Sequence, residues 1–165
     1  FLGFIYEAMD QMAAQAARLR FRTDGTITAP LVIRAPYGGG IHAPELHSDS
    51  LEALFLHSPG LKVVMPSSPA DANGLLAAAI NNPDPVLYLE PMKLYRAIKG
   101  PVDENYYEVE IGKANILQAG TDVTVVTYGP SVKTVKQVVQ QISDVSVEVI
   151  DLRTISPIDY KCIIS

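Results

Sequence analysis

Residues 30–90 alternate short apolar runs with helix-like segments, and this alternation restricts the possible folds more than any other feature of the chain. The apolar runs are PLVIRA, KVVM and PVLYL, at residues 30–35, 62–65 and 85–89. Short apolar runs bounded by turn residues are typical of strands that are buried on both faces. The order strand, helix, strand, helix, strand predicts a parallel sheet in an α/β fold.

Two helices are predicted between these strands, at residues 51–57 and 69–81. Ser, Asp and Asn are favoured at N-caps and Pro at the first helical position. The expected caps are Asp49 or Ser50 for the shorter helix, and Ser68 followed by Pro69 for the longer one. The residues of the longer helix expected to be buried are Leu75, Leu76, Ala79 and Ile80.

The rest of the chain supplies a further helix and a second α/β unit. Residues 5–19 carry apolar side chains at helical spacing and predict a helix with one buried stripe. Residues 99–121 are interrupted by Gly and Pro and predict a linker with one or two edge strands near 107–118. The second unit is expected to contain a strand, a helix and a strand at 122–128, 131–142 and 145–152.

Composition limits the class of partner. The net charge of −5 comes without a basic stripe, which argues against a nucleic-acid surface. No apolar run has the roughly 18 residues of a membrane span, so no membrane partner is expected. The single cysteine, Cys162, leaves no internal disulfide to form. Because the chain starts without Met and stops within an apparent new element, we expect a fragment of a longer protein.

The segment from the first predicted strand end to residue 48 is the candidate site. Three consecutive glycines at 38–40 precede His42 and His47, and open α/β sheets bind ligands beyond the carboxyl ends of their strands. A tight turn explains the glycines as well as a close approach to a ligand does. His47 fits a general acid or base, or a histidine bonded to the local backbone. His57 is explained by its place at a helix C-terminus.

The order of several motifs resembles the β subunits of the thiamine-diphosphate-dependent 2-oxo acid dehydrogenases. The motifs are FLGFIYEAMDQ at 1–11, RAPYGGG at 34–40, PELHSDSLE at 44–52, PGLKVVMP at 59–66, KLYR at 93–96, IGKA at 111–114 and DLRTISP at 151–157. The resemblance covers essentially the whole chain. It implies the later half of a parallel-sheet, transketolase-type pyrimidine-binding domain at 1–98, a linker at 99–121, and the start of an α/β C-terminal domain at 122–165.

The resemblance also implies a cofactor and partners. The family's α2β2 heterotetramer holds the diphosphate of thiamine diphosphate and its Mg2+ mainly on the α subunit. By residue match, His47 is the active-site histidine that assists proton transfer to the lipoyl group. Phe4 matches the aromatic residue against the aminopyrimidine ring. The family's glutamate for that ring would lie upstream of Phe1. A dihydrolipoyl acyltransferase core with its lipoyl domain is the expected second partner.

Some members of the family hold a structural K+ ion through carbonyl and side-chain oxygens. The matching positions are Leu31, Ala79, Ile80, Asn82 and Asp84. Those members have Asp followed two residues later by Asn, whereas this chain has Asn82 and Asp84. This exchange leaves open whether the chain binds the ion, since ligation by the backbone carbonyls does not depend on these two side chains.

The expected activity is oxidative decarboxylation of pyruvate with reductive acylation of lipoyl groups, by the complete heterotetramer only. Branched-chain 2-oxo acid and acetoin dehydrogenase β subunits are alternatives on the same resemblance. Other transketolase-like enzymes, such as transketolase or deoxyxylulose phosphate synthase, and a non-catalytic scaffold subunit also stay open. The expected location is the cytoplasm of a bacterium, or the mitochondrial matrix of a eukaryote.

Overall fold

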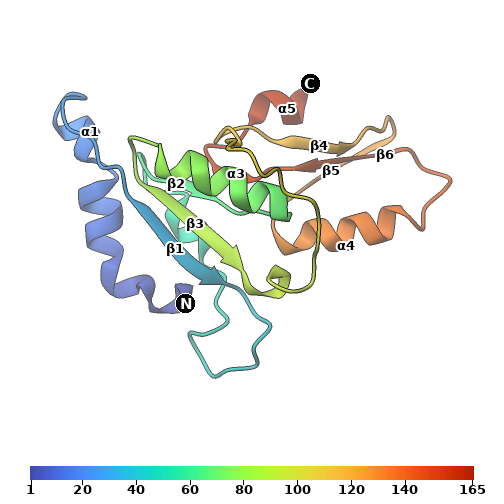
Figure 1. Ribbon diagram of the computed structural model, residues 1–165, viewed down its shortest axis with the longest axis horizontal. Helices are drawn as coiled ribbons and strands as arrows, with labels where there is room; N and C mark the ends of the chain where they lie inside the picture. Colours follow the sequence, from blue (N-terminus) through green and yellow to red (C-terminus); the bar gives the residue numbers. More distant parts are fainter.

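The computed structural model describes residues 1–165, which form two separate sheets joined by an extended linker (Figure 1). The first sheet has the order β1-β3-β2-β7 and the second has the order β4-β6-β5. The strands of the first sheet are β1 (Val32–Tyr37), β2 (Lys62–Val64), β3 (Val86–Pro91) and β7 (Thr154–Ser156). The α/β class predicted from the sequence is confirmed.

The first sheet is parallel over the three strands that the sequence predicts. Val86 of β3 lies opposite Val32 of β1 and Lys62 of β2 in parallel register. β1 is an edge strand with Arg34 exposed, so the prediction that it is buried on both faces was wrong for this strand. The fourth strand, β7, was not predicted. It comes from beyond the linker and runs antiparallel to β2, with Val63 opposite Ser156.

Helix α3 (Pro69–Ile80) forms as its sequence predicts. The Ser68 hydroxyl caps it by accepting the backbone N–H of Asp71 at 3.1 Å. Leu75 and Ala79 are buried as expected, but Ile80 is 62% exposed and Leu76 is only partly buried. Helix α2 (Glu52–Phe55) is shorter than predicted, and Leu51 precedes it without a side-chain cap. The prediction of a cap at Asp49 or Ser50 was therefore wrong.

The N-terminal helical segment is not one regular helix. A 3-10 helix, η1 (Leu2–Ala8), is followed by a π-helix, η2 (Asp10–Ala16), and by the short α1 (Leu19–Arg22). The predicted apolar stripe therefore forms only in part, because each change of pitch rotates the apolar face. Met12 is buried in the core and Ile5, Ala8 and Met9 pack against it, as predicted, and Leu2 and Ala17 are also buried there.

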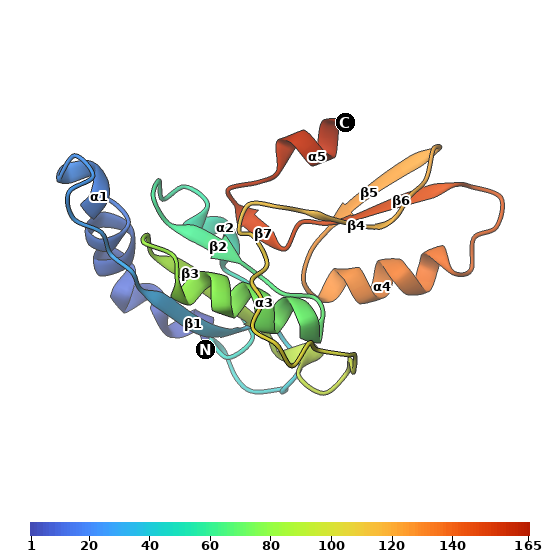
Figure 2. The same cartoon turned by 45° about the horizontal axis from the view of Figure 1, so that its top comes forward.

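The second sheet carries one helix on one face, as Figure 2 shows. Its strands are β4 (Asn115–Gln118), β5 (Val123–Thr127) and β6 (Val147–Asp151), and its helix is α4 (Pro130–Val139). β5 runs parallel to β6 and β4 runs antiparallel. Val132 of α4 is buried, whereas Val138 is 49% exposed. The short η3 (Met92–Leu94) follows β3, the linker at 99–121 contains one edge strand, β4, and the chain ends in α5 (Tyr160–Ile164).

Hydrogen bonds connect the second sheet and the linker to the first sheet and its helix α3. Ser67, which follows β2, donates its hydroxyl proton to the carboxylate of Asp151 at the end of β6. The same carboxylate accepts the backbone N–H of Arg153 at 3.1 Å. Asp151 is fully buried, and this burial raises the pKa of its carboxyl. The Tyr107 hydroxyl of the linker donates to the Ala70 carbonyl of α3 at 2.8 Å.

Replacing Asp151 by Ala is expected to lower the free energy of unfolding by about 2–4 kcal/mol, because the buried Ser67 hydroxyl and the partly buried Arg153 N–H lose their acceptor. Urea unfolding of the full-length protein measures this loss. Asp144→Ala is the matched control, because Asp144 is exposed. Equal midpoints for the two variants would show that the Ser67–Asp151 contact does not hold the two units together.

None of the helices combines the length and the apolar character that a membrane span requires.

Candidate active site

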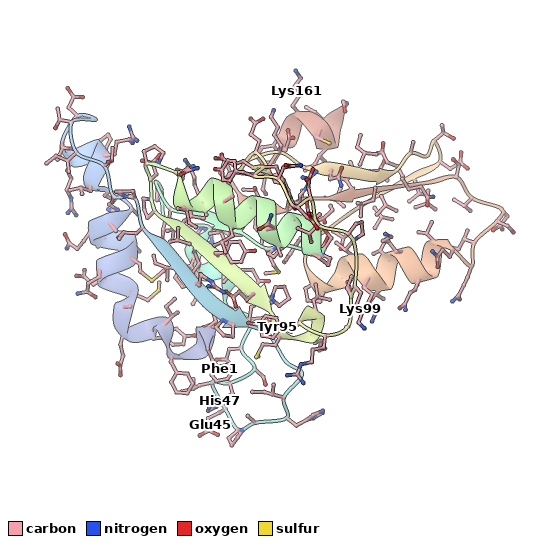
Figure 3. All side chains as sticks on the ribbon, viewed as in Figure 1. Phe1, Glu45, His47, Tyr95, Lys99 and Lys161 are labelled. Atoms are coloured by element: carbon pink, nitrogen blue, oxygen red, sulfur yellow. The ribbon has the colours of Figure 1, made fainter.

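The loop that follows β1 carries the candidate site. Gly38 and Gly40 have φ values of +75° and +134°, which few other residues adopt, and so allow the chain to turn sharply away from the sheet. The N–H of Gly38 bonds the Asp49 carbonyl at 3.2 Å and closes the base of the loop. The loop lies beside the N-terminal segment, where Phe1, Glu45 and His47 are seen together in Figure 3.

His47 is held between two aromatic rings of the N-terminal segment. Its ring centroid lies 4.9 Å from that of Phe1 and 5.0 Å from that of Phe4, the second pair in a T-shaped arrangement. Its Nδ1 lies 3.1 Å from the Glu45 carbonyl oxygen. A carbonyl only accepts, so this contact places the proton of a neutral imidazole on Nδ1 and leaves Nε2 as the basic nitrogen.

The structure therefore brings together the two residues that the resemblance singles out, His47 and Phe4. His47 is half-buried, and the ring of Phe4 is 49% exposed, so both are accessible. The backbone-bonded interpretation of His47 also holds, since the Glu45 contact is local. His42 is exposed with φ +54°, and His57 is exposed beyond α2; neither has an aromatic contact with His47 or the phenylalanines.

Glu52 connects the loop to both units, and no sequence pattern marked it beyond its place as an acidic residue in the first turn of a helix. Its Oε1 accepts the Tyr37 hydroxyl at 2.7 Å and the Tyr128 hydroxyl at 3.1 Å. Burial raises the pKa of both tyrosines, and the neighbouring Glu52 carboxylate adds to the effect. The second carboxylate oxygen of Glu52, Oε2, is buried without a hydrogen-bond partner. The three side chains line a polar cavity of about 300 Å³ with Lys93 and Ser131.

Two of the five positions expected to hold K+, Asn82 and Asp84, are already engaged by cationic side chains. Asn82 Oδ1 accepts from Lys62 Nζ at 2.7 Å. The Asp84 carboxylate pairs with Arg20 Nε at 2.5 Å and with Lys62 Nζ at 3.3 Å. Burial alone would raise the pKa of Asp84, but the bonds and charges from Arg20 and Lys62 outweigh burial and lower it. These side-chain oxygens do not fit a K+ ion, which the Lys62 ammonium would repel.

A cavity of about 820 Å³ lies beside this charged cluster, between α1 and the Pro59–Gly60 turn. Arg20 and Asp84 form part of its wall, and none of its lining residues belongs to the His47 loop. The size of a cavity does not identify a site when the groups able to do chemistry lie elsewhere. We therefore assign the candidate active site to the His47 loop.

Lys62→Met is expected to lower the free energy of unfolding by about 1–2 kcal/mol, because Asn82 and Asp84 lose a charged donor. Lys99→Met is the control, since Lys99 is exposed on the linker. With Lys62 present, exchanging potassium for sodium chloride at constant ionic strength should leave the melting temperature of the full-length protein unchanged. A stabilisation specific to potassium would contradict the assignment of Lys62 as the resident cation.

Both halves of the chain match family models. Residues 1–98 match the transketolase pyrimidine-binding domain and residues 112–165 match the transketolase C-terminal domain. The pyruvate dehydrogenase E1 component subunit beta of Staphylococcus aureus is 52% identical over 167 aligned positions. The protein of the same description from Staphylococcus epidermidis is 51% identical. Each match covers 100% of this chain and 51% of the relative, so the chain spans about half the length of these relatives.

A solved structure shares the fold. It is described as a split gene transketolase, an inactive beta4 tetramer, and superposes with a TM-score of 0.62 at 21% identity. The match covers 95% of this chain and 50% of that one. At this level of identity the likeness concerns the arrangement of the two sheets and their helices, and it carries no statement about activity.

Proposed function

The chain belongs to the transketolase family, and from this membership we propose that it is part of the β subunit of a pyruvate dehydrogenase. The observation that carries the proposal is the 52% identity to a pyruvate dehydrogenase E1 beta subunit across the whole chain. The His47–Phe4 pair supports it, because an accessible imidazole beside an exposed aromatic ring suits a cofactor-dependent acyl transfer.

The proposed reaction is the oxidative decarboxylation of pyruvate with transfer of the acetyl group to a lipoyl group. The carboxylate of pyruvate leaves as carbon dioxide, and the remaining two-carbon unit is oxidised to the acyl level. The lipoyl disulfide is reduced in the same step: one sulfur takes the acyl group and the other takes a proton. Thiamine diphosphate, when bound, supplies the nucleophilic carbon and the electron sink.

The residues of this chain would position the cofactor and transfer a proton to the lipoyl group. The exposed ring of Phe4 offers an apolar face to the aminopyrimidine of the cofactor. His47 would carry the transferred proton at Nε2, because Nδ1 is committed to the Glu45 carbonyl. An imidazole can give this proton to the departing sulfur and recover it afterwards.

The proposal also names the groups that this chain would share with partners. No three or more His, Cys, Asp or Glu side chains converge within residues 1–165 in a way that could hold a metal. We assign Mg2+ and the diphosphate to an α subunit, in an α2β2 heterotetramer that works with a dihydrolipoyl acyltransferase core and its lipoyl domain. The matched relatives are bacterial, which supports a location in the bacterial cytoplasm.

Reconstitution tests the proposal. The full-length protein and its α subunit, loaded with thiamine diphosphate and magnesium, are expected to acetylate a lipoyl domain with pyruvate as donor. The assay follows lipoyl acetylation by mass spectrometry, with 3-methyl-2-oxobutanoate and acetoin as competing donors. A preference for either competitor would show that this competitor, and not pyruvate, is the substrate. Failure to acylate with any donor, in a complex that binds the cofactor, would support the scaffold alternative instead.

A further inference from the structure

We propose that Gly3 is a positioning residue for His47, and that it acts by leaving room for the backbone of Leu46. The inference deepens the proposed function and rests on it only for the consequence in catalysis. The geometric part stands on contacts between the N-terminal segment and the loop. The segment contributes Phe1, Gly3 and Phe4, which together form the surface on which the tip of the loop lies.

Gly3 is buried, and the atoms that close over it belong to Leu46. A Cβ built at Gly3 would overlap the carbonyl oxygen, the carbonyl carbon and the Cα of Leu46. These are backbone atoms, so the clash could not be relieved by a change of rotamer. Gly3 does not have a positive φ. What this position requires is therefore the absence of a side chain, and any other residue would push the loop away from η1.

Leu46 itself is held in an unusual conformation. Its φ is +69°, in the left-handed region that residues with a Cβ rarely adopt. Its side chain is partly exposed and therefore contributes little that would hold it there. A strained backbone of this kind persists when its surroundings determine it. The packing of the Leu46 carbonyl group against Gly3 is such a constraint.

The position of the imidazole follows from the position of Leu46. Glu45, on one side, supplies the carbonyl that bonds His47 Nδ1 at 3.1 Å. His47, on the other side, lies against Phe1 and Phe4, which stand two residues before and one residue after Gly3 in the chain. A displacement of Leu46 moves both the carbonyl that sets the tautomer and the ring itself. Misplacing a reacting group by about 1 Å can cost about 100-fold in rate.

The first test compares Gly3→Ala with Gly100→Ala in the full-length protein assembled with its α subunit. Gly100 is exposed on the linker, and a Cβ there would meet nothing closer than 3.6 Å. Gly3→Ala is expected to lower the rate of lipoyl acetylation about 10- to 100-fold and to shift its pH profile. Gly100→Ala should leave both unchanged. A Gly3→Ala enzyme with the rate and pH profile of the parent overturns the consequence for catalysis; the positioning itself is tested by the chemical readout below.

A second pair of variants tests the same contact from the side of the loop. Its result does not depend on whether Gly3→Ala assembles with the α subunit. Leu46→Pro and Leu46→Gly both remove the leucine side chain, but only proline is barred from φ +69°. The expected result is a loss of about 10- to 100-fold for Leu46→Pro, with Leu46→Gly close to the parent. Equal rates for the two variants would show that the conformation of Leu46 has no consequence for catalysis.

A chemical readout separates this inference from the proposed function. Diethyl pyrocarbonate acylates accessible neutral imidazoles, and peptide mapping gives the rate at His47 relative to exposed His57 in the same molecule. The His47 rate should change in Gly3→Ala and Leu46→Pro and not in their controls. A change in reactivity without loss of acetylation would keep the positioning role and remove His47 from the reaction. An unchanged reactivity in both variants overturns the positioning role itself.

Discussion

His47→Ala in the full-length β subunit, assembled with its α subunit, is expected to lower lipoyl acetylation by about 10²–10⁴-fold, the usual contribution of a general acid or base. The structure supplies the reason. The ring stands between Phe1 and Phe4 with Nδ1 bonded to the Glu45 carbonyl, so Nε2 is the nitrogen available to move a proton. Alanine removes that nitrogen together with the imidazole ring that packs against Phe4.

The decarboxylation half of the reaction separates a role in proton transfer from damage to the site. With an artificial oxidant in place of the lipoyl domain, His47→Ala should lose much less activity than in the complete reaction. His57→Ala is the control, because His57 is exposed beyond α2 and outside the loop. Acetylation by His47→Ala at the parent rate would remove the histidine from the mechanism. Melting temperatures of the three proteins should agree, since His47 contributes no buried packing to the core.

Local signals were sufficient to predict three of the four strands of the first sheet. Three short apolar runs gave β1, β2 and β3 near their observed places, and Ser68 with Pro69 gave the start of α3. Apolar runs and caps act within a few residues, so they can be recognised without knowing the rest of the fold. The strand β7 carries no such signal, because three residues are too few to show a period. Its place depends on the pairing of Ser156 with Val63, far away in the sequence.

The candidate site was predictable only in part for the same reason. Resemblance identified His47 and Phe4, and the structure brings them together. The residues that support them are coupled through space: Gly3 through the Leu46 backbone, and Glu52 through tyrosines 15 and 76 positions away. The ion pair between Asp84 and Arg20, which are 64 positions apart, likewise leaves no recognisable pattern in the sequence. Side-chain contacts at these separations follow from the tertiary fold, and the sequence pattern predicts them poorly.

Phe55→Ala is expected to lower the free energy of unfolding by about 3–5 kcal/mol, the usual cost of truncating a fully buried aromatic side chain. Phe55 is 0% exposed and belongs to the larger core cluster, with Met12 of the N-terminal segment and Leu61 beside β2. It is the one buried residue of α2, a helix of four residues without a side-chain cap. So short a helix has little stability of its own and depends on this anchor.

Leu54→Ala provides the matched comparison, because Leu54 is the preceding residue of the same helix and is 43% exposed. Its expected loss is about 1 kcal/mol or less. Urea unfolding of the two full-length variants measures the difference. Because α2 also carries Glu52, loosening it should separate that carboxylate from Tyr37 and Tyr128, and lipoyl acetylation should fall together with stability. Similar unfolding midpoints for the two variants would show that α2 is held by its polar contacts rather than by Phe55.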